Sequence, residues 1–508
     1  MTPMSDAPEP KEEGRPSKAG WDSLAQGWTA LVGGEGRTLL WAVAILNLGL
    51  MFSTEFAVLK DYPNSGDEYA YLVSAQLFAR GKLSVPSPSL PRFFDVVHVV
   101  NDGKFYGKYP PGWPLILSLG VLLGIPWAVN PLLGTAVLFA VRAFARRHGS
   151  TVIANIAVLS LLGNPFLIFT SASYFSHTSC LLFAVLAMHG LLICAEERFS
   201  AAACLGMGFC AGLVFLIRPF SAVLLFAAPA IFLLYRLARQ PDRRASGRKL
   251  LLALLPFLLC LAVFFAYNRA QTGQALLQPF QKYAPWDAPS WPKDGQDWRI
   301  RAETHLLFRT WDLARWLPLS PLLVIFACCV QPFRGNPTYR VLIAAFISTF
   351  VGFFFYWGDG IIQYGPRYLF ETLGFLVVLT GAVVEGFRER GLLAMAGLLI
   401  LNFSTYVEAS REVSVQIEEK RNVFKLAREL QLSDAIVFLR TGSGSAPAWD
   451  CSRNGIDFTD PVLFVQDLGA ENPNLLAEYP ARRGYVYQYD AERRQGSITR
   501  MPDAGKSR

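Results

Sequence analysis

Long apolar runs separated by short polar loops dominate the chain between residues 38 and 407. Most runs are roughly 18–22 residues long, the length of helix that crosses a bilayer. They are continuously apolar rather than alternating, which does not fit a transmembrane barrel. The pattern predicts membrane helices at 38–59, 111–125, 127–145, 150–170, 174–195, 199–217, 219–237, 249–268, 315–332, 340–357, 366–387 and 390–407.

The composition indicates the same class of protein. Of the 508 residues, 52% are hydrophobic and 17% are charged, whereas soluble domains carry about 25% charged residues. These values exclude a soluble enzyme, a secreted disulfide scaffold and a disordered chain. Seven of the eight cysteines lie in apolar runs, where a thiol behaves as a small hydrophobe. We therefore predict an all-α polytopic membrane protein, with about 11–12 transmembrane helices and a small C-terminal α/β domain outside the membrane.

The charge pattern predicts the topology. The net charge of +8 does not indicate a nucleic-acid partner, because the basic residues cluster in short loops, as the positive-inside rule predicts. These clusters lie at 142–147, 236–249, 334–340 and 388–390. If they are cytoplasmic, the loops 269–314 and 358–365 and the tail 408–508 are external. With a cytoplasmic leader, the loop 60–110 is external as well.

This topology constrains residues 111–141, which Gly124-Ile125-Pro126 divides. The stretch must cross the membrane an odd number of times, so we expect one full span and one partial, re-entrant or interfacial element. Eleven crossings then put the two chain ends on opposite sides. Twelve crossings with a cytoplasmic tail are the alternative, because the charge rule is statistical.

Three regions follow from these patterns. Residues 1–37 are expected to be a mostly disordered cytoplasmic leader, and residues 38–407 a transmembrane domain with the two large external loops. Residues 408–508 are expected to form a small external domain. Helical periodicity at 417–431 and the strand-like sequences AIVFLR, PVLFVQDLG and GYVYQY give that domain its α/β character.

An acidic pair marks the first external loop. Asp67 and Glu68 precede the apolar-rich run 69–78, which we interpret as a helix on the membrane surface. Helix dipoles favour carboxylates at this end, so simple N-capping by Asp67 is the alternative to a chemical role. Near the end of the loop, Asp102-Gly103 predicts a turn between two extended pieces.

Several motifs together resemble the C-type glycosyltransferase superfamily, in particular its protein O-mannosyltransferase and aminoarabinose-transferase-like branch. They are the DEYAYLVSAQLFARGKL helix after the first span, the YPPGWPLILSLG start of the next one, and the sequences LIRP and GPRY before later spans. The resemblance covers roughly residues 38–407. It implies a hexosyl- or pentosyltransferase with a polyprenyl-phosphate sugar as donor. The acceptor would be a lipid, glycan or protein at the external face, and membrane lipids would surround the site.

The resemblance also implies roles for particular residues. An external carboxylate would deprotonate the acceptor hydroxyl; Asp67 matches that position, and Glu68 is the next candidate. The leaving group is a phosphate, whose charge cations stabilise. Arg218 and Arg367, each beside a proline at a predicted outer helix end, and Lys108 are the candidates for this task. Their alternatives are interfacial snorkelling, a flanking charge and an ordinary loop charge, respectively.

Other residues are candidates for contact with a substrate or a metal ion, namely His177, Tyr109 and Tyr364. His177 stands where many relatives carry an acidic residue nearby; a buried structural histidine is the alternative. No His/Cys/Asp spacing compels a metal site, so no cofactor is predicted and a divalent ion is left open. In the second loop, Trp286, Trp291, Trp298 and Trp311 suit a membrane belt or a sugar-stacking surface.

Two other classes of function compete with an enzyme. A transporter or flippase of lipid-linked glycans would be expected to show internal repeats and mid-membrane charges. Instead, the chain has large external loops and polar residues near the outer ends of spans. A non-catalytic scaffold whose tail recruits partners is the third hypothesis. We expect a multi-pass protein of a bacterial inner membrane, with its site and C-terminal domain facing the periplasm.

Overall fold

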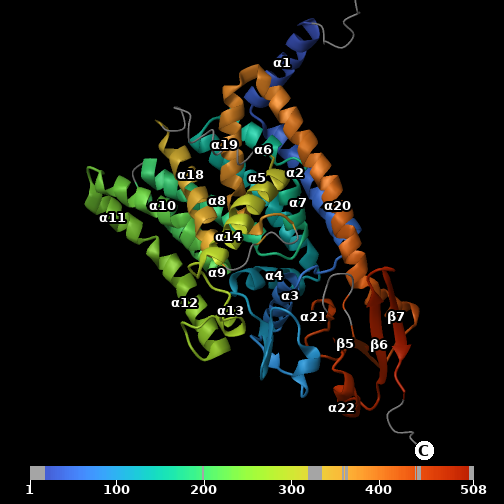
Figure 1. Ribbon diagram of the computed structural model, residues 1–508. Helices are drawn as coiled ribbons and strands as arrows, with labels where there is room; N and C mark the ends of the chain where they lie inside the picture. The colour runs from blue at the N-terminus through green and yellow to red at the C-terminus, as the bar shows by residue number, and fades with distance from the viewer. Residues whose placement is uncertain are drawn as a thin grey trace, which may run out of the picture.

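The predicted apolar runs form helices in the computed structural model, which describes residues 18–196, 199–318, 335–356, 360, 364–440, 442 and 448–502. Among these residues, eight helices are long and apolar enough to cross a membrane. The pair α6 (Thr151–Ser160) and α7 (Pro165–Ala172), bent by 64°, makes a ninth if it counts as one span. The all-α membrane class is confirmed. The predicted count of about 11–12 spans is not reached among the described residues, because Gly112–Leu122 and Ala201–Ile217 are shorter apolar helices and the predicted segment 315–332 lies mostly outside those residues. The helices of the bundle (Figure 1) are α2 (Arg37–Ser53), α5 (Pro126–His148), α6 (Thr151–Ser160), α7 (Pro165–Ala172), α8 (His177–Glu196), α9 (Ala201–Ile217), α10 (Pro219–Ala238), α11 (Arg243–Leu251), α12 (Leu254–Thr272), α18 (Pro337–Gly352), α19 (Leu373–Gly386) and α20 (Gly391–Glu429).

The stretch after the first loop contains two helices of unequal length. Helix α4 (Gly112–Leu122) is apolar but only 11 residues long, and α5, which follows it, has the length of a full span. Pro126 begins α5 at a position where a missing N–H costs nothing. These lengths agree with the expected full span and shorter element, and the number of crossings in this stretch stays a prediction.

Part of the N-terminal leader is helical. Residues Lys18–Gly33 form a helix, α1, and residues 1–17 of the leader, which we expected to be mostly disordered, lie outside the described residues. Trp28 and Val32 are four residues apart, share one helix face, and are buried in the main core. Asn155 fixes the end of α1 by donating to the carbonyl of Val32 at 2.9 Å. The helix therefore packs through one apolar face, although the leader as a whole has a polar composition.

The first loop folds against the lower end of the bundle. It contains helix α3 (Gly66–Ala79) and a three-stranded antiparallel sheet of order β1-β3-β2, formed by Val85–Pro86, Lys104–Gly107 and Val99–Asn101. The predicted Asp102-Gly103 turn joins β2 to β3, and Gly103 has the positive φ of 70° that favours glycine. Strand β3 leads directly to Lys108 and Tyr109.

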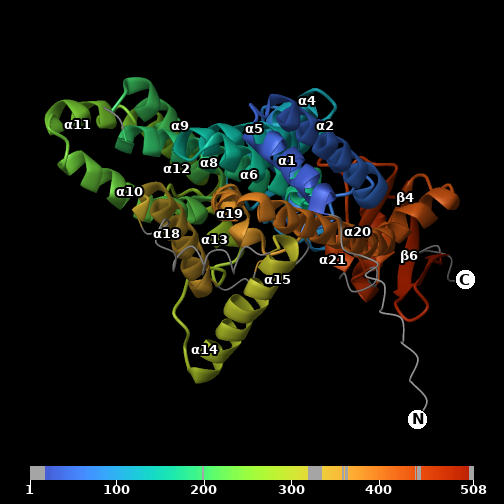
Figure 2. The ribbon, with the colours of Figure 1, turned by 90° about the horizontal axis from the view of Figure 1, so that it is seen from above.

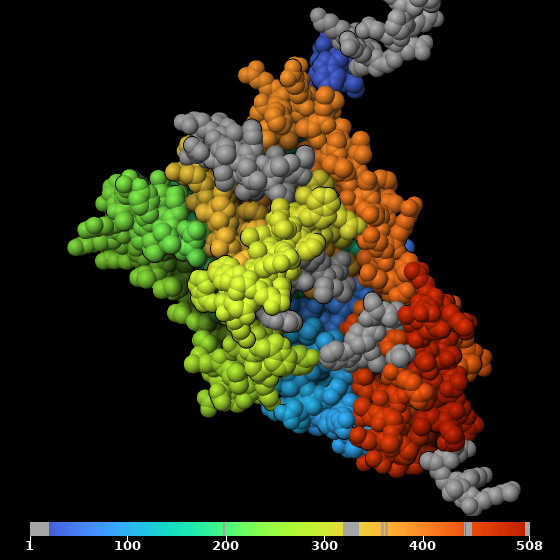
Figure 3. Space-filling model, viewed as in Figure 1, coloured from blue at the N-terminus to red at the C-terminus, as the bar shows by residue number. Residues whose placement is uncertain are grey.

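The second loop is largely helical, with α13 (Pro279–Tyr283), α14 (Gly295–Arg301) and α15 (Arg309–Trp316). Figure 2 shows α14 and α15 extending away from the bundle, and Figure 3 shows this yellow segment lying across the front of the helices. The four loop tryptophans are exposed; Trp311 keeps 75% of its surface accessible.

The C-terminal region is a helix followed by a sheet. Helix α20 continues past the predicted boundary at residue 407 and ends beside the sheet (Figure 1). The sheet has the order β5-β4-β6-β7, with β4 (Ala435–Leu439) parallel to β5 (Val462–Gln466) and β6 (Arg483–Asp490), and β7 (Gln495–Arg500) antiparallel to β6. The short helices α21 (Ala448–Cys451) and α22 (Asn472–Glu478) flank it. Strand β7, with the sequence QGSITR, lacks apolar alternation and was not predicted.

The first loop and the C-terminal sheet pack against each other. Phe93 and Phe94 of the first loop lie in one buried cluster with Ile436 and Phe438 of β4, and the rings of Phe93 and Phe438 are 6.1 Å apart. These two regions therefore lie on the same side of the membrane that the spans cross.

Candidate functional site

The start of α3 carries the acidic pair, and Ser65 caps this helix. Its hydroxyl accepts the backbone N–H of Glu68 at 3.2 Å, which satisfies one of the unpaired donors at a helix start. Asp67 is therefore not the capping residue, and the capping alternative for it is wrong. Its carboxylate contacts other elements instead.

Three side chains from distant parts of the chain meet the carboxylate of Asp67. Arg367, at the start of the last apolar hairpin, lies 3.2 Å away. The Nε2 atom of His98 lies 3.4 Å away, and the hydroxyl of Tyr109 donates to Oδ1. The Asp67 side chain keeps 20% of its surface accessible, so a small group can reach it.

The charges around Asp67 keep it ionised. Burial alone would raise the pKa of this carboxyl, but His98, Arg367, Lys108 and the Tyr109 hydrogen bond outweigh burial and hold it well below its usual value. Burial lowers the pKa of His98 to about 4 despite the attraction of Asp67. The imidazole is thus neutral at pH 7, and Arg367 and Lys108 are the cations that face the carboxylate.

Lys108 is buried in a box of aromatic rings. Its ammonium lies 4.2 Å from the ring centre of Phe280, 4.9 Å from that of Tyr283 and 5.3 Å from that of Tyr109, and 4.0 Å from Asp287. Burial lowers its pKa to about 8, while Asp67 and Asp287 oppose the shift. Lys108 is thus mostly protonated at pH 7. Because its side chain is buried, it is not an ordinary exposed loop charge.

Glu68 points into a different environment. Its side chain is fully buried, and its Oε2 accepts the backbone N–H of Tyr174 at 3.1 Å. Burial raises its pKa to about 7; Tyr174, Arg367 and Lys420 act against the shift, and Asp67 adds to it. Asp67 is the more accessible and more fully ionised member of the acidic pair.

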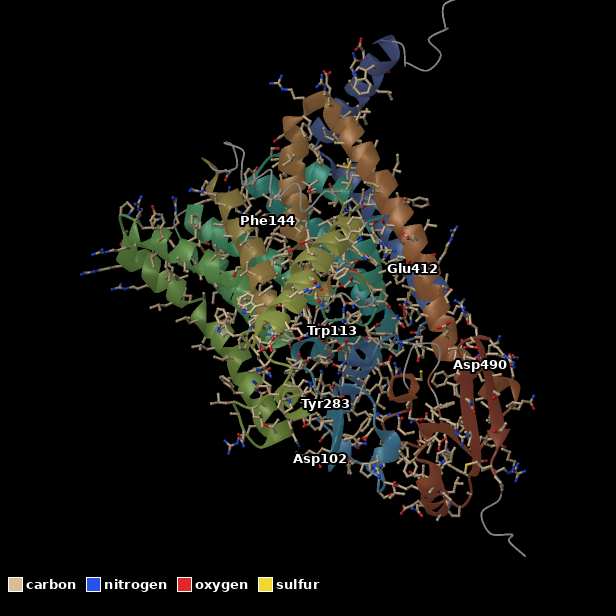
Figure 4. All side chains as sticks on the ribbon, viewed as in Figure 1. Asp102, Trp113, Phe144, Tyr283, Glu412 and Asp490 are labelled. Atoms are coloured by element: carbon tan, nitrogen blue, oxygen red, sulfur yellow. The ribbon has the colours of Figure 1, made fainter. Side chains whose placement is uncertain are left out.

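The YPPGW motif places Lys108 and Tyr109 near the bundle. A Cβ atom on Gly112 would lie 2.7 Å from the backbone of Leu216, so only glycine lets α4 begin this close to α9. The buried indole of Trp113 donates to the carbonyl of Tyr174 at 2.8 Å. Figure 4 labels Trp113 and Tyr283 in the region where the helix bundle meets the two loops.

Arg218 already has a partner. Its Nε lies 2.7 Å from Oε1 of Glu371, which is fully buried, and its guanidinium carbon lies 5.8 Å from the ring centre of Tyr368. The sequence interpretation missed Glu371, although an ionisable residue inside an apolar span is itself a functional signal. Arg218 therefore lies at the edge of the site, next to Tyr368, which follows Arg367 in the chain. The carboxylate of Glu371 balances the charge of Arg218.

His177 and Tyr364 lie deeper in the helices. His177 packs against Phe175 and Phe370, with ring centres 5.4 and 6.3 Å away. Neither of its ring nitrogens has a hydrogen-bond partner among the described residues. Tyr364 is fully buried, and its hydroxyl accepts the amide of Asn64 at 3.4 Å.

The described residues include no group of three or more His, Cys, Asp or Glu side chains that could hold a metal ion.

His98 is, besides Glu371, a residue of the site that sequence reasoning missed. It has a positive φ of 66°, a conformation that costs a residue with a side chain about 1 kcal/mol or more, and Tyr283 accepts its backbone N–H at 2.9 Å. A lone histidine in a loop gave no signal of this role.

Comparison with known proteins identifies the fold. The model of the Alg9-like mannosyltransferase family matches residues 98–279, about a third of the chain, including Lys108, Tyr109 and Arg218. The crystal structure of ArnT from Cupriavidus metallidurans bound to undecaprenyl phosphate superposes with a TM-score of 0.56 at 13% identity, covering 90% of this chain and 93% of that one. Its apo form gives 0.55 at 14% identity, with 92% and 94% covered. No curated protein matches the chain by sequence. The resemblance to the C-type glycosyltransferase superfamily is thereby confirmed, and the chain has the fold of that superfamily.

Proposed function

We propose that this protein is a membrane glycosyltransferase that moves a sugar from a polyprenyl-phosphate donor to an acceptor hydroxyl, with Asp67 as general base. The observation that carries the proposal is the geometry around Asp67. In a chain of this fold, an ionised and partly accessible carboxylate lies 3.2 Å from Arg367 and close to Lys108. The carboxylate can act as the base that takes the acceptor proton, and the two cations can stabilise the charge of the leaving phosphate.

In the proposed reaction, the acceptor hydroxyl approaches Asp67, which takes its proton. The acceptor oxygen forms a bond to the anomeric carbon of the sugar, and the bond from that carbon to the phosphate oxygen breaks. The electron pair of this bond leaves with the polyprenyl phosphate. Arg367 is suited to stabilise that anion, because its planar guanidinium offers paired N–H donors, and Lys108 adds a second positive charge.

Donor binding would also strengthen the base. Arg367 and Lys108 hold the pKa of Asp67 low while they face it. A phosphate placed between these cations would compensate part of their charge, so the pKa of Asp67 would rise towards its usual value. The carboxylate would accept a proton more readily once the donor is in place. This coupling would limit unproductive chemistry before the donor binds.

The site suits a lipid-linked donor by its location. It lies where α3 and α4 meet the ends of the membrane helices, so a polyprenyl chain could remain among lipids while its phosphate reaches Arg367. ArnT, which shares this fold, has a structure with undecaprenyl phosphate bound. We propose that the site and the region 408–508 face the periplasm of a bacterial inner membrane, with a lipid, glycan or protein as acceptor.

The test is a donor panel offered to purified protein in nanodiscs, scored by release of free polyprenyl phosphate in the presence of membrane extract as the acceptor source. The proposal expects release from at least one polyprenyl-phosphate sugar and none from the matching nucleotide sugars. Turnover of a nucleotide sugar, or movement of intact lipid-linked sugar across the bilayer without release, would overturn it.

A further inference from the structure

The C-terminal region contacts the segment that carries the acidic pair. Residues 62–69 lead from the first span into the first turn of α3, and two of their backbone carbonyl groups accept hydrogen bonds from the C-terminal region. The ammonium of Lys420 donates to the carbonyl of Asn64. The guanidinium of Arg453 donates to the carbonyl of Pro63 at 3.2 Å.

Aromatic side chains of the same segment make further contacts with the C-terminal region. The guanidinium of Arg453 lies 4.8 Å from the ring centre of Tyr69 and 5.4 Å from that of Tyr62, within the range of cation–π attraction. The hydroxyl of Tyr69 donates to the backbone carbonyl of Asn454 at 2.5 Å. Arg453 therefore contacts both ends of the segment that contains Asp67.

Asp450 links the two cations. Its carboxylate lies 2.9 Å from the ammonium of Lys420 and 3.7 Å from the guanidinium of Arg453. The side chains of Lys420 and Arg453 keep only 10% and 8% of their surface, so water does not weaken these contacts as it does at a surface. In Figure 1, α21, which carries Asp450, lies between α3 and β5.

We propose that Lys420 and Arg453 are positioning residues for Asp67, and that the C-terminal region is thereby part of the transfer machinery. The inference rests on the proposed function. Asn64 is three residues before Asp67, so the hydrogen bonds to the carbonyl groups of Pro63 and Asn64 fix the position at which α3 begins. The first turn of a helix has few bonds of its own, and a displacement of about 1 Å at a reacting group can cost on the order of 10²-fold in rate.

A structural role alone would give a different result from a positioning role. Loss of folded protein lowers the amount of active enzyme without changing the rate of each folded molecule. Misplacement of Asp67 lowers the rate of each molecule but leaves donor binding nearly intact, because Arg367 and Lys108 belong to other elements. The ratio of catalytic rate to donor affinity separates the two roles.

The experiment uses the full-length protein in nanodiscs, with Arg453→Ala, Arg453→Lys and Lys420→Met compared at equal folded concentration. Arg440→Ala is the matched control, because Arg440 pairs with Asp467 at 2.9 Å within the C-terminal sheet and does not touch residues 62–69. We expect kcat to fall about 10- to 100-fold in Arg453→Ala and Lys420→Met, with donor Kd within about threefold of the wild type. Arg453→Lys should recover part of the loss, since it restores one donor and the cation–π contact.

Two outcomes would overturn the inference. One is wild-type kcat in folded Arg453→Ala and Lys420→Met; the other is an equal loss in Arg440→Ala, which would indicate general damage to the sheet. An Asp67→Asn variant measured alongside keeps this failure distinct from failure of the proposed function. If Asp67→Asn is inactive and Arg453→Ala is not, only the positioning role is lost.

Discussion

Replacing Arg367 separates its charge from its geometry. The guanidinium lies 3.2 Å from Asp67 and its carbon lies 4.4 Å from the ring centre of Phe175. Arg367→Lys keeps the positive charge but loses the planar fork and most of the stacking. Arg367→Ala loses all three.

The magnitudes follow from these contacts. A hydrogen bond to a charged group is worth about 1.5–3 kcal/mol, so losing the phosphate contact in Arg367→Ala should reduce kcat/KM by about 10- to 150-fold. The stacking is worth about 0.5–2 kcal/mol, so Arg367→Lys should lose about 2- to 30-fold. Removing the cation also raises the pKa of Asp67, because Arg367 helps to lower it. The acidic limb of the pH–rate profile should therefore move to higher pH in Arg367→Ala.

The assay is donor affinity and single-turnover transfer in nanodiscs, from about pH 2 to 9, because the usual pKa of an aspartate is about 4 and the acidic limb set by Asp67 starts below it. Arg315→Ala is the matched control, because Arg315 pairs with Glu408 and Glu412 on α20 rather than with the site. If Arg367→Ala binds the polyprenyl-phosphate sugar and reacts as the wild type does, Arg367 is only a helix-end anchor. The proposed phosphate site would then have to move.

Three further predictions concern Glu68, the packing of the first loop and the topology. Because the pKa of Glu68 is raised to about 7, its folded form binds more protons, so stability should fall as pH rises from about 4.3 to 7; Glu68→Gln should abolish this dependence in thermal unfolding. A Cβ on Gly107 would lie 2.3 Å from a backbone oxygen of α3, so Gly107→Ala should lose about 1–3 kcal/mol of stability, whereas Gly49→Ala, which meets nothing within 4 Å, should not. Cysteines placed at the exposed residues Asp102 and Glu471 should react with an impermeant reagent from the same side of the membrane, and labelling from opposite sides would contradict the packing of loop and sheet.

Hydropathy predicted the membrane helices well, because a bilayer requires long apolar segments whatever they pack against. It was less informative where packing decides. Trp28 and Val32 make α1 a packed helix despite its polar neighbours. Strand β7 is held by pairing with β6, and its own sequence carries no clear strand pattern.

The candidate site was predictable only in part. The motifs pointed to Asp67, Arg367 and Lys108 as separate residues, and the structure brings them together. The partners that complete the arrangement come from remote positions: His98 from the first loop and Glu371 from inside a span. No local pattern reveals such long-range contacts, because tertiary packing creates them.

The role of Asp67 as general base is tested most directly by single-turnover transfer by Asp67→Asn in nanodiscs. The assay uses saturating amounts of the polyprenyl-phosphate sugar that the donor panel identifies, with membrane extract as the acceptor source. Asparagine keeps the shape and removes the base. Asp102→Asn, which alters a side chain with 85% of its surface exposed in the same loop, is the control. We predict a loss of about 10²–10⁴-fold in rate for Asp67→Asn, with the folded yield and donor binding preserved. The rate of Asp102→Asn should stay near that of the wild type. Transfer by Asp67→Asn at the wild-type rate would contradict the account, and Glu68 would become the next candidate for the base.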